Sequence, residues 1–447
     1  MRTKFLSIIT CFLLVSFAMS ACLDSDETYE YSSDATVHYF SLDTIHGVDY
    51  RFTIDQLEKV IYNRDSMPVG ADTILDRIIV DTMTVTGWVT TQDTLFSTGD
   101  SVDLRGAINS NEGLKFKIYA ADGLSTSTYT LKINVHNQIP DSLVWRDMQE
   151  VGEVFSTTAN ANAQRAVLWN DPNNGVEYLL VFASNTTLYK SSTELSAYAW
   201  TTETISGMPA EADLTSLINF REALYVLAEG DVYTSTDATT WEKSESLSGN
   251  VQALLAVFPE NSINGNATTL AAIQQDGEEK YFCTTTDPTV EWTRGEVVED
   301  DFPITNLSYT ALITATGVNK VVLVGTPEED LDVTTPWFSM DGKGWASLET
   351  TSYDTYCPVR KNPTIIYYGG YFYMLGGEFD AIYYSVTGIA WFKTEKLFLL
   401  PDTFREYGSS YSLVVDKNNY IWIIWGGHDT ENRVWRGRLN RFGFAIQ

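Results

Sequence analysis

Six short polar segments hold most of the side chains that could bind or transform a ligand. They occupy residues 184–187, 228–231, 275–280, 327–335, 376–381 and 426–432, and five of the six carry two or more carboxylates. Carboxylates bind hydroxyl groups and cations, and two opposed carboxylates can hydrolyse a glycosidic bond. The last two segments contribute the candidate ligand-binding residues Glu378, Asp380, His428, Asp429 and Glu431.

Arginine and aromatic residues accompany these acidic segments. The candidates are Arg165, Arg360, Arg405, Tyr373 and Trp425. Aromatic side chains stack on sugar rings, while arginine and aspartate bind hydroxyl and carboxylate groups, so the mixture suits a sugar or polyol site. The alternative is that these are the solvated tips of hairpins in an acidic protein, and His428 fits a solvated loop residue better than a ligand or base.

Recognisable enzyme and cofactor motifs are missing from the sequence. It contains no HExxH, no G-x-S-x-G and no phosphate-binding glycine loop, and its four histidines are dispersed. The carboxylate pair that a glycosidase needs cannot be chosen from sequence. We therefore expect no catalytic residues, no bound metal and no cofactor, with Ca²⁺ on the acidic loops left open.

A repeated phrase indicates which elements position these segments. "DVYTSTDATTWEK" (231–243), "PWFSMDGKGWASL" (336–348) and "AIYYSVTGIAWFK" (381–393) each run from a strand through a serine and a turn to a tryptophan. The anchors Trp200, Trp241, Trp292, Trp345 and Trp391 are 41 to 53 residues apart, and Phe442 takes the place of a sixth. A period of this length is typical of propellers and solenoids.

Each repeat contains four strand signals, which predicts a six-bladed β-propeller over residues 138–447. The last repeat reads "SYSLVVD", "YIWIIWGG", "RVWRGRL" and "FGFAIQ". Residues 142–148, "SLVWRDM", precede the first repeat, and whether they close the ring stays open. The acidic segments fall between second and third strands, so they share a face with the connections between blades.

The repeated phrase resembles the Asp-box of sialidases and related propellers, one residue shorter. The matching residues are Ser235, Asp237 and Trp241, then Ser339, Asp341 and Trp345, then Ser385 and Trp391. The resemblance implies a structural motif on the face opposite the ligand site. Sialidases also need an arginine triad and an Arg-Ile-Pro motif, whereas Arg165 lies in "QRAVLWN", so the resemblance covers the scaffold alone.

The first residues resemble a bacterial lipoprotein signal. Residues 1–21 contain Arg2 and Lys4, an apolar run of signal-peptide length, and small residues before Cys22. Cys22 is the expected lipidation site, and residues 22–34 form an acidic tether like the surface-export signal of Bacteroidota lipoproteins. This predicts an outer membrane lipoprotein on the extracellular side. The alternative is an ordinary signal peptide followed by an incidental cysteine.

Residues 35–137 alternate apolar and polar residues in five to seven short strands, which predicts an Ig-like β-sandwich. The stretch "KIYAADGLSTSTYTLKINV" resembles the closing hairpin of Ig-like modules, with Asp122-Gly123 at its turn.

Cys283 and Cys357 fall in different repeats, so we expect two buried free thiols. The fold class is thus all-β: an Ig-like β-sandwich followed by a six-bladed β-propeller.

The formal charge of −30 excludes nucleic acid as a partner and limits membrane contact to the lipid anchor. The whole chain resembles a family of uncharacterised Bacteroidota surface lipoproteins with a domain of unknown function, which ends in "VWRGRLNRFGF". We therefore predict a cell-surface-anchored, non-catalytic binding lipoprotein that recognises a glycan or a partner protein through the propeller loop face. The alternative is a glycoside hydrolase or lyase that acts on an extracellular glycan.

Overall fold

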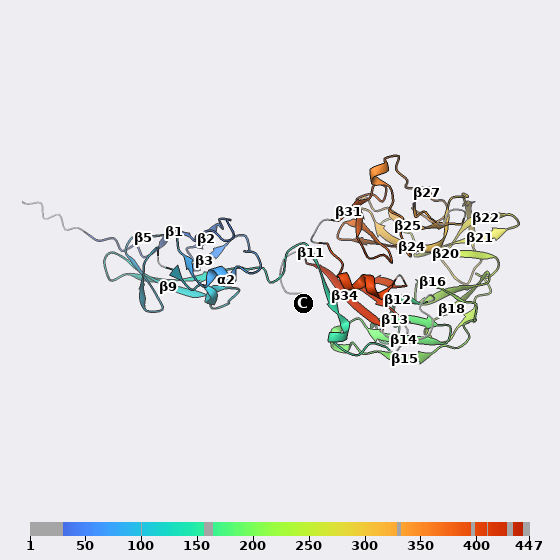
Figure 1. Ribbon diagram of the computed structural model, residues 1–447, viewed down its shortest axis with the longest axis horizontal. Helices are drawn as coiled ribbons and strands as arrows, with labels where there is room; N and C mark the ends of the chain where they lie inside the picture. Colours follow the sequence, from blue (N-terminus) through green and yellow to red (C-terminus); the bar gives the residue numbers. More distant parts are fainter. Residues whose placement is uncertain are drawn as a thin grey trace, which may run out of the picture. The chain divides into compact units, whose positions relative to one another are not determined.

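The computed structural model describes residues 30–99, 101–155, 164–328, 332–394, 398–408, 410–426 and 432–440. Cys22, the expected lipidation site, and the signal sequence lie outside these residues. The chain separates at the junction between Pro140 and Asp141 into two compact units, and each is described by itself (Figure 1). Almost all of their regular structure is strand.

The N-terminal unit is built on one six-stranded sheet. Its order is β2 (Phe52–Asp55), β3 (Val60–Asn63), β10 (Thr126–Lys132), β9 (Leu114–Tyr119), β6 (Trp88–Thr91) and β7 (Thr94–Phe96). Two-stranded sheets pair β1 (Val37–Ser41) with β5 (Thr82–Val85) and β4 (Ile78–Ile79) with β8 (Ser101–Val102). The short helices are α2 (Asp72–Leu75) and η1 (Arg105–Ala107). β10 pairs in parallel with β3 and antiparallel with β9, and alternate residues of β9 enter a single core.

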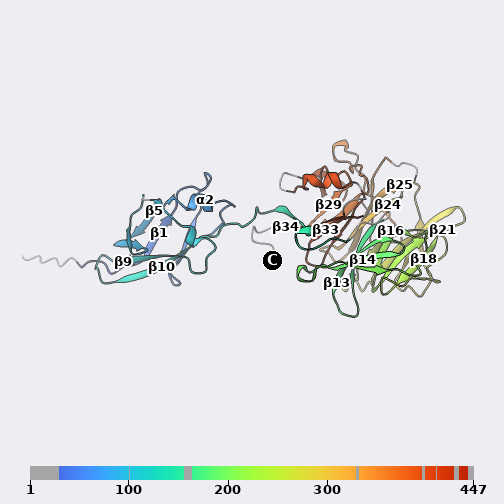
Figure 2. The same ribbon diagram turned by 60° about the horizontal axis from the view of Figure 1, so that its bottom comes forward.

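The hairpin between β9 and β10 has the turn that the sequence predicts. Asp122 Oδ1 accepts hydrogen bonds from the backbone N–H groups of Leu124 at 2.8 Å and Ser125 at 2.9 Å. These bonds, with the Ser125 hydroxyl, lower the pKa of Asp122. Gly123 has a φ of 69°, a conformation that glycine adopts without strain. Figure 2 shows the two strands side by side.

The C-terminal unit contains six four-stranded antiparallel sheets in the described residues. In chain order, the first sheet consists of β12 (Arg165–Asn170), β13 (Glu177–Ser184), β14 (Thr187–Ser192) and β15 (Thr201–Thr204). The second consists of β16 (Asp213–Phe220), β17 (Ala223–Ala228), β18 (Asp231–Ser235) and β19 (Glu242–Lys243). The third consists of β20 (Val251–Phe258), β21 (Thr269–Asp276), β22 (Glu279–Thr285) and β23 (Thr293–Val297). The next two are β24 (Pro303–Ile313), β25 (Asn319–Pro327), β26 (Thr335–Ser339), β27 (Ala346–Ser347); and β28 (Thr364–Tyr368), β29 (Tyr371–Leu375), β30 (Tyr383–Ser385), β31 (Phe392–Lys393). The sixth joins β32 (Ser412–Val415), β33 (Ile421–Trp425), β34 (Arg433–Asn440) and β11 (Ser142–Asp147). Short 3₁₀ helices are η2 (Met148–Glu150), η4 (Leu195–Ala197), η5 (Tyr353–Thr355) and η6 (Asp402–Tyr407).

The first strands of successive sheets lie against one another. β12 contacts β16, β16 contacts β20, β20 contacts β24, β24 contacts β28, and β32 contacts β12. In Figure 1 the labels of β12, β16, β20 and β24 fall near the centre of this unit, whereas β15, β18, β22, β27 and β31 fall toward its edge. Second strands such as β33, "IWIIW", are buried along their whole length because sheets cover both faces.

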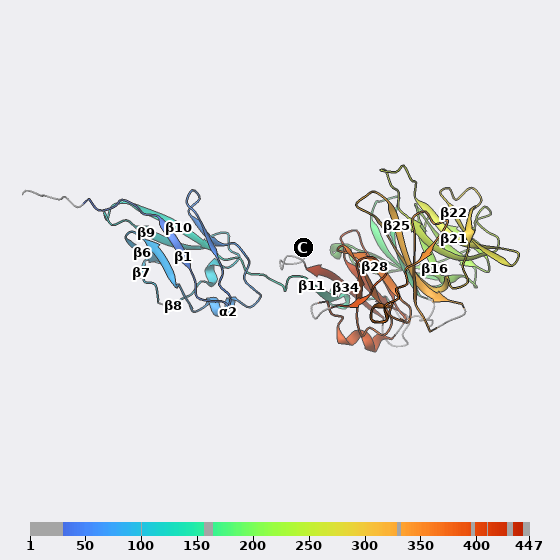
Figure 3. The same ribbon diagram turned by 90° about the horizontal axis from the view of Figure 1, so that it is seen from above.

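The sixth sheet takes its outer strand from the start of the unit. β11 pairs antiparallel with β34, from Ser142 opposite Asn440 to Asp147 opposite Trp435, and Figure 3 shows the two strands together. Residues 142–148, which the sequence left unassigned, therefore fill the place that was predicted for "FGFAIQ". That stretch, with Phe442, lies outside the described residues.

Three of the repeated tryptophans pack between neighbouring sheets. Trp241 lies among side chains of the first and second sheets, Trp345 among the third and fourth, and Trp391 among the fourth and fifth. All three are at least 94 % buried. Trp200 and Trp292 are only partly buried. The two differ in their partners: Trp200 packs on Phe155, and Trp292 donates to the carbonyl of Leu247.

A serine hydroxyl organises the turn before each buried tryptophan, and an aspartate joins it before Trp241 and Trp345. Ser339 Oγ accepts from Gly342 N at 2.9 Å, and Ser385 Oγ accepts from Gly388 N at 2.9 Å. Gly342 has a φ of 80°, and an added Cβ would lie 2.9 Å from the Cβ of Ala271, so the turn fits closely against the preceding sheet. In the first of these turns Ala238 takes the corresponding left-handed conformation, with a φ of 67°.

The indole N–H groups of the three tryptophans allow a matched test of these turns. Trp241 Nε1 donates to Ala238 O at 3.2 Å and Trp391 Nε1 donates to Gly388 O at 3.1 Å. Trp345 Nε1 is buried and has no partner among the described residues. Replacement by phenylalanine should therefore lower the free energy of unfolding by about 1 kcal/mol more at Trp241 and Trp391 than at Trp345. Urea denaturation followed by circular dichroism measures the difference, and an equal or larger loss for Trp345→Phe would contradict it.

The carboxylate of Asp237 predicts a pH dependence of stability. Burial alone raises its pKa, but the backbone amides of Thr240 and Thr239 and nearby hydroxyls outweigh that effect and lower the pKa from 3.8 to about 2. A lowered pKa stabilises the fold above pH 3.8, and the stabilisation disappears as the pH falls through about 2.

Asp237→Asn should therefore lower the free energy of unfolding by at most about 1 kcal/mol near neutral pH, because the carboxylate is exposed. Denaturation between pH 7 and pH 2 should show the wild type and the variant converging at the acid end. Thr236→Ala, which removes no charge from the same turn, serves as the control. A wild-type advantage that persists unchanged at pH 2 would exclude the carboxylate as its source.

Candidate functional site

A cavity of about 220 Å³ opens where the first strands of four sheets meet. β12, β16, β20 and β24 supply nearly all of its wall. Its polar side chains include Arg165, Asp213, Thr215, Gln252, Asn306 and Tyr309. We call it the axial cavity. Most of these residues lie near the starts of their strands, so the cavity lies on the face that the sequence predicted for ligand binding.

Three of the four strands are irregular at this cavity. The register of β16 shifts between Asp213 and Ile218, that of β20 shifts on both sides of Ala253 and Leu254, and that of β24 shifts between Pro303 and Ser308. A bulge leaves a residue outside the ladder and turns its side chain in a new direction. Many of the residues that line the cavity, including Thr215, Gln252 and Asn306, fall inside these shifts. The bulges therefore deliver polar groups into a centre that regular strands would line with apolar residues.

Local hydrogen bonds hold two of these groups in place. Asp213 Oδ1 accepts from the Thr215 backbone N–H at 2.9 Å and from the Thr215 hydroxyl at 2.7 Å. Within the described residues no group donates to Asp213 Oδ2. Asn306 has a φ of 50°, in the left-handed region that asparagine tolerates better than most residues. Its side chain donates to Thr326 Oγ1 at 3.4 Å.

Arg165, the first residue of β12, lines the axial cavity. It also lines a second cavity of about 340 Å³, whose wall includes β28 and β32. Burial lowers the pKa of Arg165, and burial raises the pKa of Tyr309, which lines both cavities, to about 12. In the part of the chain that the structure describes, the Arg165 guanidinium has neither an ion-pair nor a hydrogen-bond partner.

Arg360, Glu378 and Asp380 do come together, but not around the cavity. Arg360 Nη1 lies 2.6 Å from Asp380 Oδ1 and 3.6 Å from Glu378 Oε2, and its Nη2 donates to the Tyr383 hydroxyl at 2.9 Å. None of these residues lines the axial cavity. These side chains bind one another and connect the segment before β28 to the loop after β29, and a ligand-binding role for them stays a prediction.

Arg405, Tyr373 and Trp425 also lie away from the cavity. Trp425 is completely buried among aromatic side chains and its Nε1 donates to Gly408 O at 3.2 Å, so it cannot stack on a ligand. The Tyr373 ring stacks on Phe398 with centroids 4.6 Å apart, in the middle of β29 rather than at its end. Arg405 is exposed on η6 and its Nε donates to Phe379 O at 3.3 Å.

Of the predicted ligand-binding residues, Arg165 is the one that the structure places on the axial cavity, while His428, Asp429 and Glu431 lie outside the described residues. The sequence analysis missed Asp213, Thr215, Gln252 and Asn306. The sequence does contain a signal for two of them. An inner strand that is covered on both faces is expected to be apolar throughout, whereas Gln252 interrupts "VQALLAV" and Asn306 interrupts "PITNLSY".

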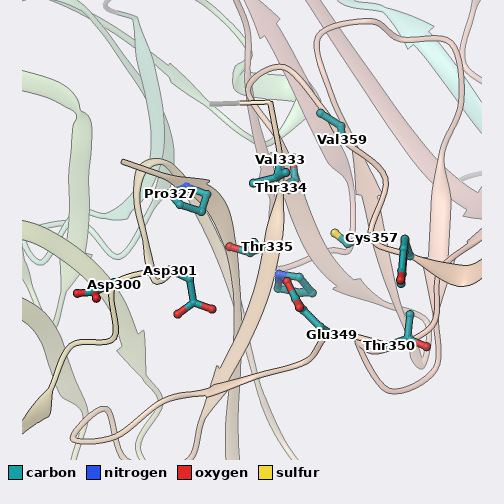
Figure 4. A pocket seen from close by; sticks show the side chains of 12 residues that line it. Asp300, Asp301, Pro327, Val333, Thr334, Thr335, Glu349, Thr350, Cys357 and Val359 are labelled. Carbon is teal, nitrogen blue, oxygen red and sulfur yellow. The ribbon is translucent and has the colours of Figure 1, made fainter. Parts of the chain in front are cut away.

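A larger cavity of about 600 Å³ lies beside the fourth sheet (Figure 4). We call it the lateral pocket. Figure 4 shows Asp300 and Asp301 on one side of it and Cys357 and Thr350 on the other, with Thr335 between them. Glu349 adds a third carboxylate. Cys283 and Cys357 are both free, as predicted, but Cys357 is only partly buried.

The described residues offer neither a metal-binding cluster nor a membrane-spanning helix. No group of three or more His, Cys, Asp or Glu side chains there is arranged to hold a metal ion, so the calcium expectation stays a prediction. Within those same ranges no helix has the length and apolar character that crossing a bilayer requires.

The axial cavity suits binding better than acid–base catalysis. It combines a cation, one carboxylate, two amides and several hydroxyls in a small space. Among the residues described, Asp213 is the single carboxylate that lines it, whereas glycoside hydrolysis by the usual mechanism requires two. The arrangement can hold a polar group by several directed hydrogen bonds and one ion pair.

Solved structures similar to this chain include a nutrient-binding protein, a lectin and a glycosidase. An auxiliary nutrient binding protein from Bacteroides thetaiotaomicron has 10 % identity and a TM-score of 0.42, covering 92 % of this chain and 100 % of that one. The Aleuria aurantia lectin with α-methyl-L-fucoside has 12 % identity and a TM-score of 0.38, with 63 % and 93 % covered. An α-L-arabinofuranosidase mutant from Fusarium graminearum with an iminosugar inhibitor has 14 % identity and a TM-score of 0.38, with 63 % and 96 % covered.

No curated protein matches the chain. Two family descriptions do, and together they span nearly all of it: the DUF6242 N-terminal domain, a domain of unknown function, over residues 22–133, and the DUF6242 beta propeller domain over residues 139–447. The chain belongs to the DUF6242 family, and its C-terminal unit is the β-propeller domain of that family.

Proposed function

We propose that this protein is a non-catalytic binding protein that holds one polar group of a glycan or of a partner protein in the axial cavity of its β-propeller. The convergence of three bulged first strands on a polar cavity carries the proposal. Bulges cost ladder hydrogen bonds and are concentrated beside functional sites. Here they expose hydrogen-bonding groups at a position where the fold itself requires none.

The size of the cavity limits what it can take. About 220 Å³ is less than the roughly 300–1,000 Å³ of pockets that enclose a drug-sized ligand. A single terminal sugar residue or one side chain fits such a space, and the rest of the ligand would extend over the surrounding loops. Hydroxyl and amide side chains such as Thr215, Gln252 and Asn306 are suited to sugar hydroxyls.

The architecture gives this role a physical setting. In our proposal the six sheets are the blades of a six-bladed propeller, the tryptophan turns are shortened Asp-boxes, and the N-terminal unit is an Ig-like spacer. Lipid on Cys22 would anchor the chain to the outer membrane and the acidic tether would lead it to the extracellular side. Two or more acyl chains give the stable attachment that one chain does not.

A glycoside hydrolase or lyase is the second candidate, because the lateral pocket holds the three carboxylates Asp300, Asp301 and Glu349. Incubation with host and plant glycans distinguishes the two roles. Product formation that is lost in Asp301→Asn or Glu349→Gln would establish an enzyme and overturn the non-catalytic proposal. Tight binding without product supports it.

A glycan array and a pull-down of surface proteins identify the ligand. Gln252→Ala and Asn306→Ala should each weaken binding of that ligand about 3- to 10-fold, the usual effect of one lost hydrogen bond. Glu278→Gln, at an exposed loop tip on the same face, is the matched control and should bind as the wild type does. If Glu278→Gln weakens binding and the two cavity variants do not, the ligand binds the loops and the axial cavity is not its site.

Anchoring has a separate test. Cys22→Ser should move the protein from the detergent-soluble membrane fraction to the soluble fraction, because the thiol that carries the lipid is gone. Surface protease treatment of intact cells then reports the side of the membrane for the wild type. Equal membrane association of Cys22→Ser and the wild type would exclude the lipid anchor.

A further inference from the structure

Arg165 is partly buried, and within the described residues no group in contact with it offsets its charge, unlike the situation at Arg360 and Arg436. Arg360 is paired with Asp380, and Arg436 lies over the Tyr420 ring at 3.4 Å from its centroid. Within the described residues Arg165 has no ion pair, no hydrogen bond and no aromatic ring beneath it. Asp213 and the hydroxyls of Tyr309 and Tyr411 are its nearest electrostatic partners, and Asp213 is beyond ion-pairing distance.

A partly buried charge without a counter-charge in contact weakens the fold. Removing a guanidinium from water is unfavourable unless a counter-charge or directed hydrogen bonds replace the lost hydration. Water in the cavity can satisfy its five N–H donors but cannot balance the charge. A purely structural arginine would be bonded to carbonyl groups of the surrounding strands, as buried polar groups generally are. The position therefore has the character of an anion site.

We propose that the ligand of the axial cavity carries a single carboxylate, as a terminal uronic acid residue does, and that this carboxylate pairs with Arg165. This inference rests on the proposed binding function and names the class of ligand. The guanidinium fork matches the two oxygens of a carboxylate. Asp213, Thr215, Gln252 and Asn306 then face the neutral hydroxyls of the same sugar.

The remaining charges restrict the ligand to one anionic group. Asp213 stands in the same cavity, and the chain as a whole carries a formal charge of −30. A polyanion would meet repulsion from this field at every further charge. A neutral glycan that ends in one uronic acid avoids that cost and still supplies the counter-charge that Arg165 lacks.

The test compares glucuronate with glucose and with the methyl ester of glucuronate, each added to the mature chain and followed by calorimetry and thermal melting. The wild type should bind glucuronate more tightly than either neutral sugar, and Arg165→Gln should bind it about 10- to 100-fold more weakly. Arg165→Lys keeps the charge but not the fork and should retain part of the preference. Arg405→Gln removes an exposed arginine outside the cavity and should leave all three affinities unchanged.

Thermal melting without ligand separates a binding role from a structural one. If Arg165 is unpaired in the free protein, Arg165→Gln should melt a few degrees higher than the wild type, because a buried uncompensated charge is gone. Circular dichroism verifies that the variant is folded. A lower melting temperature together with unchanged glucuronate binding would show a structural arginine and overturn the inference.

The outcomes also separate this inference from the proposed function. Suppose that glucose and glucuronate bind equally well, that Gln252→Ala weakens this binding, and that Arg165→Gln does not. This result would refute the pairing of a ligand carboxylate with Arg165 and leave the axial cavity as the binding site. Binding of a larger glycan or protein at the loops, with no effect of any cavity variant, would refute both. Glucuronate binding that depends on Arg165 and is reduced by added salt supports both.

Discussion

The pairing of β11 with β34 is the interaction on which the C-terminal unit depends. It joins residues 142–147 to residues 433–440 through six residue pairs, so the first strand of the unit completes its last sheet. Without it β34 would present an open edge, and the two ends of the unit would be joined only by side-chain packing and side-chain hydrogen bonds such as that from Ala166 N to Ser412 Oγ. Closure also fixes β12 against β32, and that contact sets the distance across the centre where Arg165 lies.

A closed ring of sheets can tolerate irregular strands at its centre because the outer strands hold it together. The tryptophan turns fasten neighbouring sheets where Trp241, Trp345 and Trp391 are buried. Trp345, for example, packs against Phe258 at the end of the first strand β20, with ring centroids 6.1 Å apart. Each buried indole contributes up to several kcal/mol of apolar burial. The bulges of β16, β20 and β24 interrupt the ladder of backbone hydrogen bonds in the first strands of the second, third and fourth sheets. Under the proposed function, the tryptophan turns serve stability and the bulged starts of the first strands serve recognition.

Sequence reasoning succeeded where a local pattern has a local cause. In the turn before Trp345 the Ser339 hydroxyl accepts from the Gly342 backbone N–H within a stretch of seven residues, so the spacing is visible in "SMDGKGW". It failed where partners are distant: Arg360 is paired with Asp380, and β11 with β34, through contacts that no spacing encodes. The bulges were equally hidden, because a register shift depends on two strands. Gln252 and Asn306 left only the faint signal of an amide in an apolar run.

The loop charges and Arg165 illustrate two different uses of arginine in an acidic protein. Two carboxylates, Glu378 and Asp380, lie beside the Arg360 guanidinium, so the cluster becomes a structural tie. Around Arg165 the two cavities offer apolar, amide and hydroxyl side chains and the more distant Asp213, so Arg165 has no ion-pair partner among the described residues. In our inference the positive charge of Arg165 therefore pairs with a negative group of the ligand. The acidic exterior of the protein repels further negative charges, so the ligand should carry little negative charge elsewhere.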